Sequence, residues 1–287
     1  MKLYDLHVHS NLDNKTAPEQ FLERLGEAGL YGAGVFSPSP GPGAGDHKGK
    51  ARLDNVFAFC KDHPGRLFPV FFIGPHEDGA IDLAQEAIER GIAAFKIICF
   101  DHYVYDDKTM SLLEVIAKGG KSVCFHTGIL WNGAPSGDYN RPCNWEHMLH
   151  IPGLKFSAGH CSWPWIDECI ALYGKIQNAH NSKPELCEMF LDLTPGTPVA
   201  YRRELLTKLF TVGYDVEHNI LFGTDCSTSD YRVEWARMWQ DIDNGLYQEL
   251  GIETQTRNAI YNENILRFFG AIKTERKLAP LTIDGRV

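Results

Sequence analysis

The chain has 287 residues, of which 44% are hydrophobic and 23% are charged, and its formal net charge is −9. This composition is typical of a globular protein with a sizeable core, and the acidic balance argues against nucleic acid or an anionic membrane as the main partner. No stretch approaches the roughly 20 apolar residues of a membrane-spanning helix, and "MKLYDLHVHS" does not resemble a signal peptide, so we expect a cytoplasmic protein.

Short apolar runs alternate with helical patterns along the chain. The first run covers residues 2–8, and "TAPEQFLERLGEAG" (16–29) has the spacing of a helix with Thr16 as its N-cap. Further strands are predicted at 32–37, 66–73, 93–98, 121–127, 154–160, 189–194 and 219–225. Helices are predicted at 52–62, 79–91, 108–120, 145–149, 165–179, 198–212 and about 229–272.

Eight short apolar strands, each followed by a helix, are typical of a parallel sheet that is covered by helices. In a chain of this length they favour a closed (β/α)₈ TIM barrel over an open sheet. No linker-like stretch divides the sequence. We therefore expect residues 1–287 to form a single barrel domain that ends in C-terminal helices.

The segment "SPSPGPGAG" (37–45) follows the second predicted strand. It is not a phosphate-binding loop, because Ala44 and Ala51 stand where that motif needs Gly and Ser or Thr. Two interpretations stay open, a plain connecting loop and a substrate loop over the barrel mouth.

Eight cysteines occur without any C-x-x-C pair. In a long chain without an expected export signal, this pattern indicates free thiols rather than disulfides. We expect most of them to be buried and to pack as small hydrophobic residues.

Polar side chains close several of the predicted strands. The first strand ends with His7 and His9, and the fifth, sixth and eighth end with His126, His160 and Asp225. The fourth strand carries Lys96. Because the carboxyl ends of barrel strands meet at one face, these groups should gather there. Imidazole and carboxylate ligands are typical of Zn²⁺, so the pattern predicts a site for a divalent metal.

Alternation along the first strand places Asp5, His7 and His9 on one face, which we expect to point into the barrel. Tyr4, Leu6 and Val8 would then pack outward against the helices. Asp5 lies one pleat deeper than the histidines, and we expect it to support the site without binding the metal. A lone strand-end histidine is usually structural, but five groups in one register favour a metal site.

The remaining histidines carry less information. His76 and His63, for example, are interpreted as loop or surface residues, and His102, which follows the fourth strand, stays open.

H-x-H on the first strand, Lys on the fourth, His on the fifth and sixth and Asp on the eighth resemble the pattern of the amidohydrolase superfamily. The H-x-H at the N-terminus, "FGTDC" on the eighth strand and "IYNENILRFFG" (260–270) are most similar to its amidohydrolase-2 branch of hydrolases and decarboxylases. The resemblance implies that His7, His9, His126 and Asp225 bind the metal. It also implies that Asp225 takes a proton from the metal's water. His160 would bind a second metal or, with one metal, orient or deprotonate the attacking water.

Lys96 has two open roles. The resemblance implies that it could be carbamylated and bridge two metals, and an apolar inward position would lower its pKa and favour that reaction. Alternatively, its free ammonium binds a substrate carboxylate or pairs with Asp225. We expect zinc, as one or two ions, with Mn, Fe or Ni as alternatives.

The resemblance implies a hydrolase in which metal-activated water cleaves an amide, lactone or ester bond of a small, cyclic or carboxylated molecule. A metal-dependent non-oxidative decarboxylase and a non-catalytic metal-binding barrel remain as alternatives. Trp131 and Trp163 follow strands that carry site histidines, and Arg141 and Arg232 follow the fifth and eighth strands, so we consider these four as substrate contacts. The expected partner is a small molecule, with neither nucleic acid nor membrane, and a homo-oligomer stays open.

Overall fold

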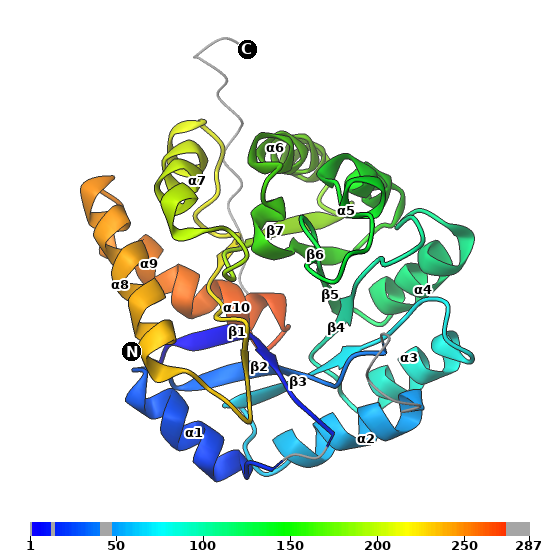
Figure 1. Ribbon diagram of the computed structural model, residues 1–287. Helices are drawn as coiled ribbons and strands as arrows, with labels where there is room; N and C mark the ends of the chain where they lie inside the picture. Colours follow the sequence, from blue (N-terminus) through cyan, green and yellow to red (C-terminus); the bar gives the residue numbers. More distant parts are fainter. Residues whose placement is uncertain (1, 13–14, 41–47, 274–287) are drawn as a thin grey trace.

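The described residues of the computed structural model, 2–12, 15–40 and 48–273, contain one curled parallel sheet (Figure 1). Its nine strands are β1 (Tyr4–His9), β2 (Gly32–Phe36), β3 (Leu67–Phe72), β4 (Ala94–Ile97), β5 (Ser122–Phe125), β6 (Lys155–Ala158), β7 (Glu188–Asp192), β8 (Ile220–Leu221) and β9 (Cys226–Ser227). They are paired in the order β8-β7-β6-β5-β4-β3-β2-β1-β9.

Helices surround this sheet on the outside (Figure 1). They are α1 (Pro18–Glu27), α2 (Gly49–Cys60), α3 (Ala80–Glu89), α4 (Asp107–Lys118), α5 (Ser136–Tyr139), α6 (Ile166–Ser182), α7 (Val199–Thr211), α8 (Val233–Glu249), α9 (Thr254–Tyr261) and α10 (Glu263–Phe268), with 3₁₀ segments η1 (Pro142–His150) and η2 (Gly159–Ser162). The predicted (β/α)₈ barrel is confirmed.

The last barrel strand is divided into two short pieces. β8 pairs with β7, and β9 pairs with β1. Between them, the Leu6 amide donates to the Phe222 carbonyl at 2.9 Å and the Asp225 amide donates to the His7 carbonyl at 3.0 Å. The segment from β8 to β9 therefore closes the ring between β7 and β1, and the break places Asp225 between the two pieces.

Two groups of apolar side chains form the core. The larger one fills the space between the sheet and the helices, and it includes Phe95 and Ile97 of β4. The smaller one includes Ala94 of β4, inward residues of β1, β2, β3, β5, β7 and β8, and Phe268 and Phe269 at the end of α10. Because α10 packs at the amino ends of the strands, it covers one end of the barrel and leaves the carboxyl ends for the site.

The predicted alternation along β1 is wrong for its first half. Tyr4 and Leu6 belong to the inner apolar cluster, whereas Val8 packs outward. The reason is a register shift between Asp5 and Val8, where β1 carries one residue more than β2. This bulge exchanges the two faces, so Asp5 does not share the inward face of His7.

Element ends differ from the predictions in a few places. The N-cap of α1 is Ala17 rather than Thr16, and the helical region predicted at about 229–272 consists of α8, α9 and α10. Seven of the eight cysteines are buried as free thiols, and Cys143 is exposed. Of the proposed substrate loop at 37–45, residues 41–45 lie outside the described residues.

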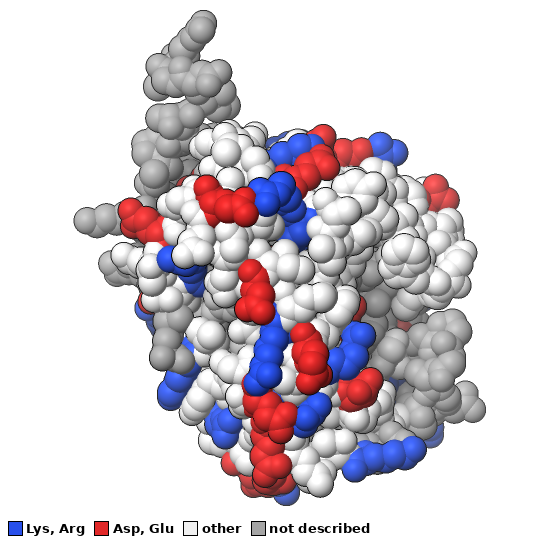
Figure 2. Space-filling model, turned by 60° about the vertical axis from the view of Figure 1, so that its left-hand side comes forward, with Lys and Arg blue, Asp and Glu red and all other residues white. Residues whose placement is uncertain are grey.

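The surface carries charges of both signs. Figure 2 shows basic and acidic side chains interspersed over one face of the molecule. Several form ion pairs, such as Arg203 with Glu249 at 2.5 Å. Within the described ranges, none of the helices combines the length and the apolar character that a bilayer crossing needs.

Candidate metal site and active-site pocket

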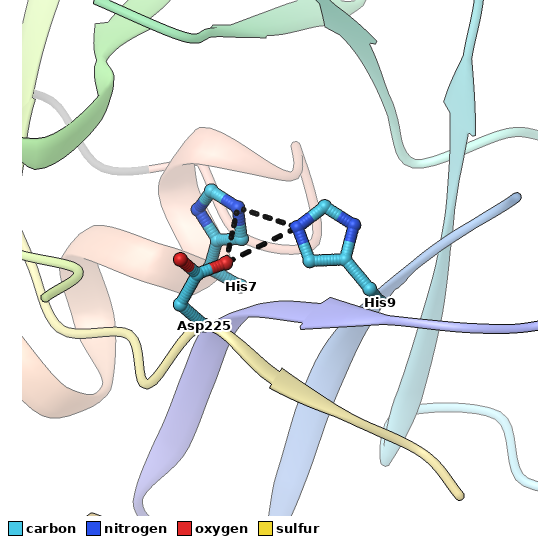
Figure 3. Close-up of side chains that lie close together, drawn as sticks. All are labelled: His7, His9 and Asp225. Carbon is cyan, nitrogen blue, oxygen red and sulfur yellow. Dashed lines mark hydrogen bonds and ion pairs between the residues drawn. The ribbon is translucent and has the colours of Figure 1, made fainter. Parts of the chain in front are cut away.

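Three side chains converge at the carboxyl ends of β1 and β8. Figure 3 shows the rings of His7 and His9 and the carboxylate of Asp225 directed toward a common point. The two Nε2 atoms lie 3.1 Å apart. Asp225 Oδ1 lies 3.2 Å from His9 Nε2 and 3.6 Å from His7 Nε2. The three ligand atoms thus form a nearly equilateral triangle.

This triangle has the dimensions of a metal site. Ligand atoms bound at about 2.0–2.1 Å to one tetrahedral zinc ion lie about 3.3 Å from one another. His7 Nδ1 faces Asp192 Oδ2 at 3.1 Å, so the ring donates there and Nε2 carries a lone pair. A lone pair that faces another ring nitrogen and a carboxylate oxygen requires a proton or a cation between them. The donor set therefore fits a divalent metal.

Asp192 is the functional residue that the sequence prediction missed. It is fully buried at the end of β7, and its Oδ1 accepts from the Thr194 amide at 2.8 Å. Burial works to raise the pKa of Asp192, but the hydrogen bond and charge of His7, together with His160 and Thr194, outweigh it and lower the pKa. A carboxylate behind a ligating imidazole fixes its tautomer and orientation. The signal was available, because Asp192 also closes an apolar strand.

Asp225 is held in an unusual backbone conformation. Its φ is +59°, which a residue with a side chain rarely adopts. Gly223, two residues earlier, lets this segment lie close to β1. A Cβ at that position would lie 2.9 Å from the Cβ of His7. Strain of this kind is found where a side chain must be aimed at a site.

Asp5 anchors the segment that carries Asp225. Its Oδ1 accepts from the amides of His7 and Thr224, both at 3.0 Å. Its Oδ2 accepts from the Thr224 hydroxyl at 2.6 Å and from the Tyr231 hydroxyl at 2.9 Å. The buried carboxylate therefore ties β1 to the chain just before Asp225 and reaches neither ligand side chain.

His126 and His160 line the same pocket outside this group of three. His160 does not end a strand but lies in η2 with φ +58°, and its Nδ1 faces the Thr194 carbonyl at 3.1 Å. His126 follows β5, and its Nε2 faces the Ile129 carbonyl at 3.1 Å. Each ring donates one N–H to backbone and keeps its other nitrogen as an acceptor. Their rings lie 4.8 Å apart between centroids.

Burial favours the neutral form of His7, His126 and His160. It lowers the pKa of His7 to about 4, with the charge of Lys96 adding to the effect, and it lowers the pKa of His126 well below the usual value. Burial likewise lowers the pKa of His160. At Asp225 burial works to raise the pKa, but hydrogen bonding to His9 and the nearby histidines outweigh it and hold the pKa well below normal. Neutral imidazoles and an ionised carboxylate are the forms that bind a metal.

The pocket above the triangle has a volume of about 420 Å³. Lys96 and Ile98 line it while Phe95 and Ile97 pack outward, as the alternation predicts. Lys96 is 1% exposed, and its Nζ has no hydrogen-bond partner among the described residues. Burial lowers its pKa, against the opposing effect of Cys124, Asp192 and Asp225. This ammonium is available to a ligand in the pocket.

Two of the four proposed substrate contacts lie at the pocket. Trp131 and Trp163 line it with nearly parallel rings, 6.2 Å apart between centroids and inclined by 16°. Arg141 instead pairs with Glu168 on α6, and Arg232 lies over the ring of Trp235. Neither arginine is among the residues that line the pocket.

Solved structures share this fold at low sequence identity. A structure assigned as a 2-pyrone-4,6-dicarboxylic acid hydrolase from Acinetobacter baumannii, with citric acid bound, is 13% identical with a TM-score of 0.61, over 94% of this chain and 100% of that one. The 2,6-dihydroxybenzoate decarboxylase from Rhizobium is 11% identical with a TM-score of 0.64, over 94% and 99%. The 4-oxalomesaconate hydratase from Rhodopseudomonas palustris is 13% identical with a TM-score of 0.59, over 93% and 95%.

No curated protein sequence matches the chain. The amidohydrolase family model Amidohydro_2 matches residues 45–271, which is most of the sequence. The match begins after β1, so it was found without the two histidines of the H-x-H motif, and it includes Lys96, His126, His160 and Asp225. The chain therefore belongs to the amidohydrolase family.

Proposed function

We propose that the protein is a metal-dependent hydrolase that cleaves an amide, lactone or ester bond of a small cyclic or carboxylated molecule. The observation that carries the proposal is the triangle of His7 Nε2, His9 Nε2 and Asp225 Oδ1 beneath the pocket. These residues would hold the metal, and zinc suits two imidazoles and one carboxylate. When bound, such a metal lowers the pKa of a coordinated water and polarises a carbonyl group.

Asp225 would transfer the proton in that reaction. Its side chain is 38% exposed, and its pKa is held low, so the carboxylate is ionised and reaches the open pocket. It would accept a proton from the attacking water and return it to the leaving group. His160 turns its free Nε2 away from Thr194 and would hold the same water or the substrate oxygen.

Lys96 and the two tryptophans support a planar substrate that carries a carboxylate. A buried ammonium without a hydrogen-bond partner in the described residues suits a substrate carboxylate. Trp131 and Trp163 suit a planar ring at the pocket mouth. The alternative role of Lys96, a carbamate that holds a second metal together with His126 or His160, predicts a ¹³C carbamate signal after incubation with labelled bicarbonate and metal.

The structural neighbours suggest the compounds to assay. Their names include a hydrolase of 2-pyrone-4,6-dicarboxylic acid and a decarboxylase of 2,6-dihydroxybenzoate. Both compounds are planar, cyclic and carboxylated, and both would satisfy Lys96 and the tryptophan pair. The same site could therefore serve non-oxidative decarboxylation, which is the second candidate.

An assay that separates the two reactions tests the proposal. The zinc-loaded protein is incubated with cyclic lactones, cyclic amides and hydroxybenzoates, while the ring-opened carboxylate product and CO₂ release are followed in parallel. We expect a ring-opened product without CO₂ for at least one lactone or amide, and its loss in Asp225→Asn. Release of CO₂ alone would establish the decarboxylase. No turnover of any compound, with metal bound, would favour a binding protein.

A further inference from the structure

We propose that His76, His102 and Asp106 form a second site for a divalent transition metal such as Zn²⁺, at the rim of the barrel face that carries the first site. His76 lies in the loop between β3 and α3, and the other two lie in the loop between β4 and α4. The two sites share no residue. This cluster joins the β3–α3 loop to the β4–α4 loop.

The ligand atoms of the cluster are close to one another. His76 Nε2 lies 3.1 Å from Asp106 Oδ2, which is close to the spacing of two ligands on one zinc ion, about 3.3 Å. One ring nitrogen of His102 completes a set whose members all lie within 4.8 Å. His76 is 46% exposed, so its ring is free to turn toward a common ion.

His102 is prepared to act as a ligand. Its Nδ1 faces Asp101 Oδ1 at 3.0 Å, so that nitrogen donates to a carboxylate and Nε2 keeps its lone pair. Nε2 is buried and has no hydrogen-bond partner in the described residues. A buried acceptor without a donor is costly, and an ion would satisfy it. An imidazole held by a carboxylate on its far side is the usual arrangement of a metal-bound histidine.

Both loops are held in place around the cluster. The Asp106 carboxylate caps α4, accepting from the Thr109 amide at 2.9 Å and the Thr109 hydroxyl at 3.0 Å. Next to His76, Glu77 accepts from the buried Arg52 at 2.6 Å and from the Gly74 amide at 2.5 Å. Two of the three ligands are thus fixed before an ion arrives, and only the exposed His76 must adjust.

The resulting site would have two imidazoles, one carboxylate and a remaining position open to water. That donor set favours Zn²⁺, Ni²⁺ or Cu²⁺ over Mg²⁺ and Ca²⁺, which prefer oxygen ligands. The ion would bridge the β3–α3 and β4–α4 loops and stabilise the rim of the pocket face.

Metal stoichiometry tests this proposal. Metal-free full-length protein is dialysed against Zn²⁺ alone, and bound zinc is measured for the wild type, His76→Ala, His102→Ala and His63→Ala. His63 is the matched control, because its Nε2 faces Glu19 Oε1 at the same 3.1 Å and the described residues offer no third ligand there. We expect His76→Ala and His102→Ala to bind one equivalent less than the wild type, and His63→Ala to bind the same amount.

A spectroscopic measurement isolates the second site. In His9→Ala, which lacks a ligand of the first site, added Co²⁺ should still give visible absorption bands of a bound ion. These bands should disappear in His9→Ala/His76→Ala and persist in His9→Ala/His63→Ala. Equal zinc content in all four proteins of the first experiment, or Co²⁺ bands that survive the loss of His76, would overturn the proposal. His76 is exposed, so its substitution leaves the fold intact.

Discussion

The fully buried carboxylate of Asp192 accepts a hydrogen bond from His7 Nδ1 at 3.1 Å. This contact joins the end of β7 to β1, two strands that do not pair with each other. It fixes which nitrogen of His7 is available, and it turns that nitrogen toward His9 and Asp225. The metal affinity of the site should therefore depend on a residue that does not touch the metal.

Replacing Asp192 with Asn should weaken zinc binding by roughly 10–100-fold, because a neutral amide supports the imidazole less well than a carboxylate. Competition with a chromophoric chelator would measure the affinity. Asp241→Asn, an exposed change on α8, is the control and should bind zinc like the wild type. Equal affinity in both variants would show that Asp192 does not orient His7.

Asp5→Asn should destabilise the protein without emptying the site. The carboxylate accepts four hydrogen bonds, and the NH₂ group of an amide cannot accept the two that reach Oδ2, so we expect a loss of about 2–4 kcal/mol in the free energy of unfolding. Urea unfolding would measure this loss. Zinc stoichiometry at saturation should stay unchanged, whereas His7→Ala should lose the ion. If Asp5→Asn lost zinc as completely as His7→Ala, Asp5 would have to be assigned to the metal itself.

The stability of the metal-free protein should fall on acidification because of His7. Burial lowers the pKa of this imidazole from 6.5 to about 4, so between these values the unfolded chain binds a proton that the folded chain does not. The contribution of the neutral His7 to the free energy of unfolding is therefore fully present above pH 6.5, and it is lost as the pH falls toward 4. His7 alone should account for about 2 kcal/mol between pH 7 and pH 5.

The variant His7→Gln isolates this contribution. It removes the titrating group and keeps a polar side chain, so its urea midpoint should change less between pH 7 and pH 5 than that of the wild type. Both proteins must be measured in the presence of a chelator. An identical pH dependence in the two proteins would show that His7 is not held neutral by the fold.

Lys96→Met should stabilise the metal-free protein, and it should abolish the activity of the zinc-loaded protein. The substitution removes a buried ammonium that lacks a hydrogen-bond partner in the described part of the chain, and it keeps most of the volume. We expect a gain of about 1–3 kcal/mol, measured by urea unfolding without bicarbonate. Lys118→Met on the exposed face of α4 should change stability by less than about 0.5 kcal/mol. A loss of stability in Lys96→Met would mean that the ammonium has a structural role.

The barrel could be predicted because its strands are short apolar runs that repeat with helical patterns between them. The break in the last strand could not, because "NILFGTD" is continuous as a pattern while the pairing of β8 and β9 depends on β7 and β1. The exchange of faces along β1 could not be predicted for the same reason. A bulge arises from pairing with β2 and leaves no local mark on the residues.

The site could be predicted only as a set of strand-end groups. His7, His9 and Asp225 meet with ligand atoms 3.1 to 3.6 Å apart, but the left-handed backbone at Asp225 and His160 is imposed by tertiary packing. Arg141 follows a site strand, yet its side chain pairs with Glu168 on α6 and not with the pocket. Position after a strand indicates which face a residue is on, not which way its side chain points.

Zinc binding by His9→Ala tests the central claim most directly. His9 is about one-third exposed, so its substitution should leave the fold intact. The His76→Ala background removes zinc bound by the cluster of His76, His102 and Asp106. Bound zinc is measured after dialysis for His76→Ala and for His76→Ala/His9→Ala. We expect at least one tightly bound equivalent of zinc in His76→Ala and its loss in His76→Ala/His9→Ala. Equal zinc content in the two proteins would contradict a metal centre built on His7, His9 and Asp225.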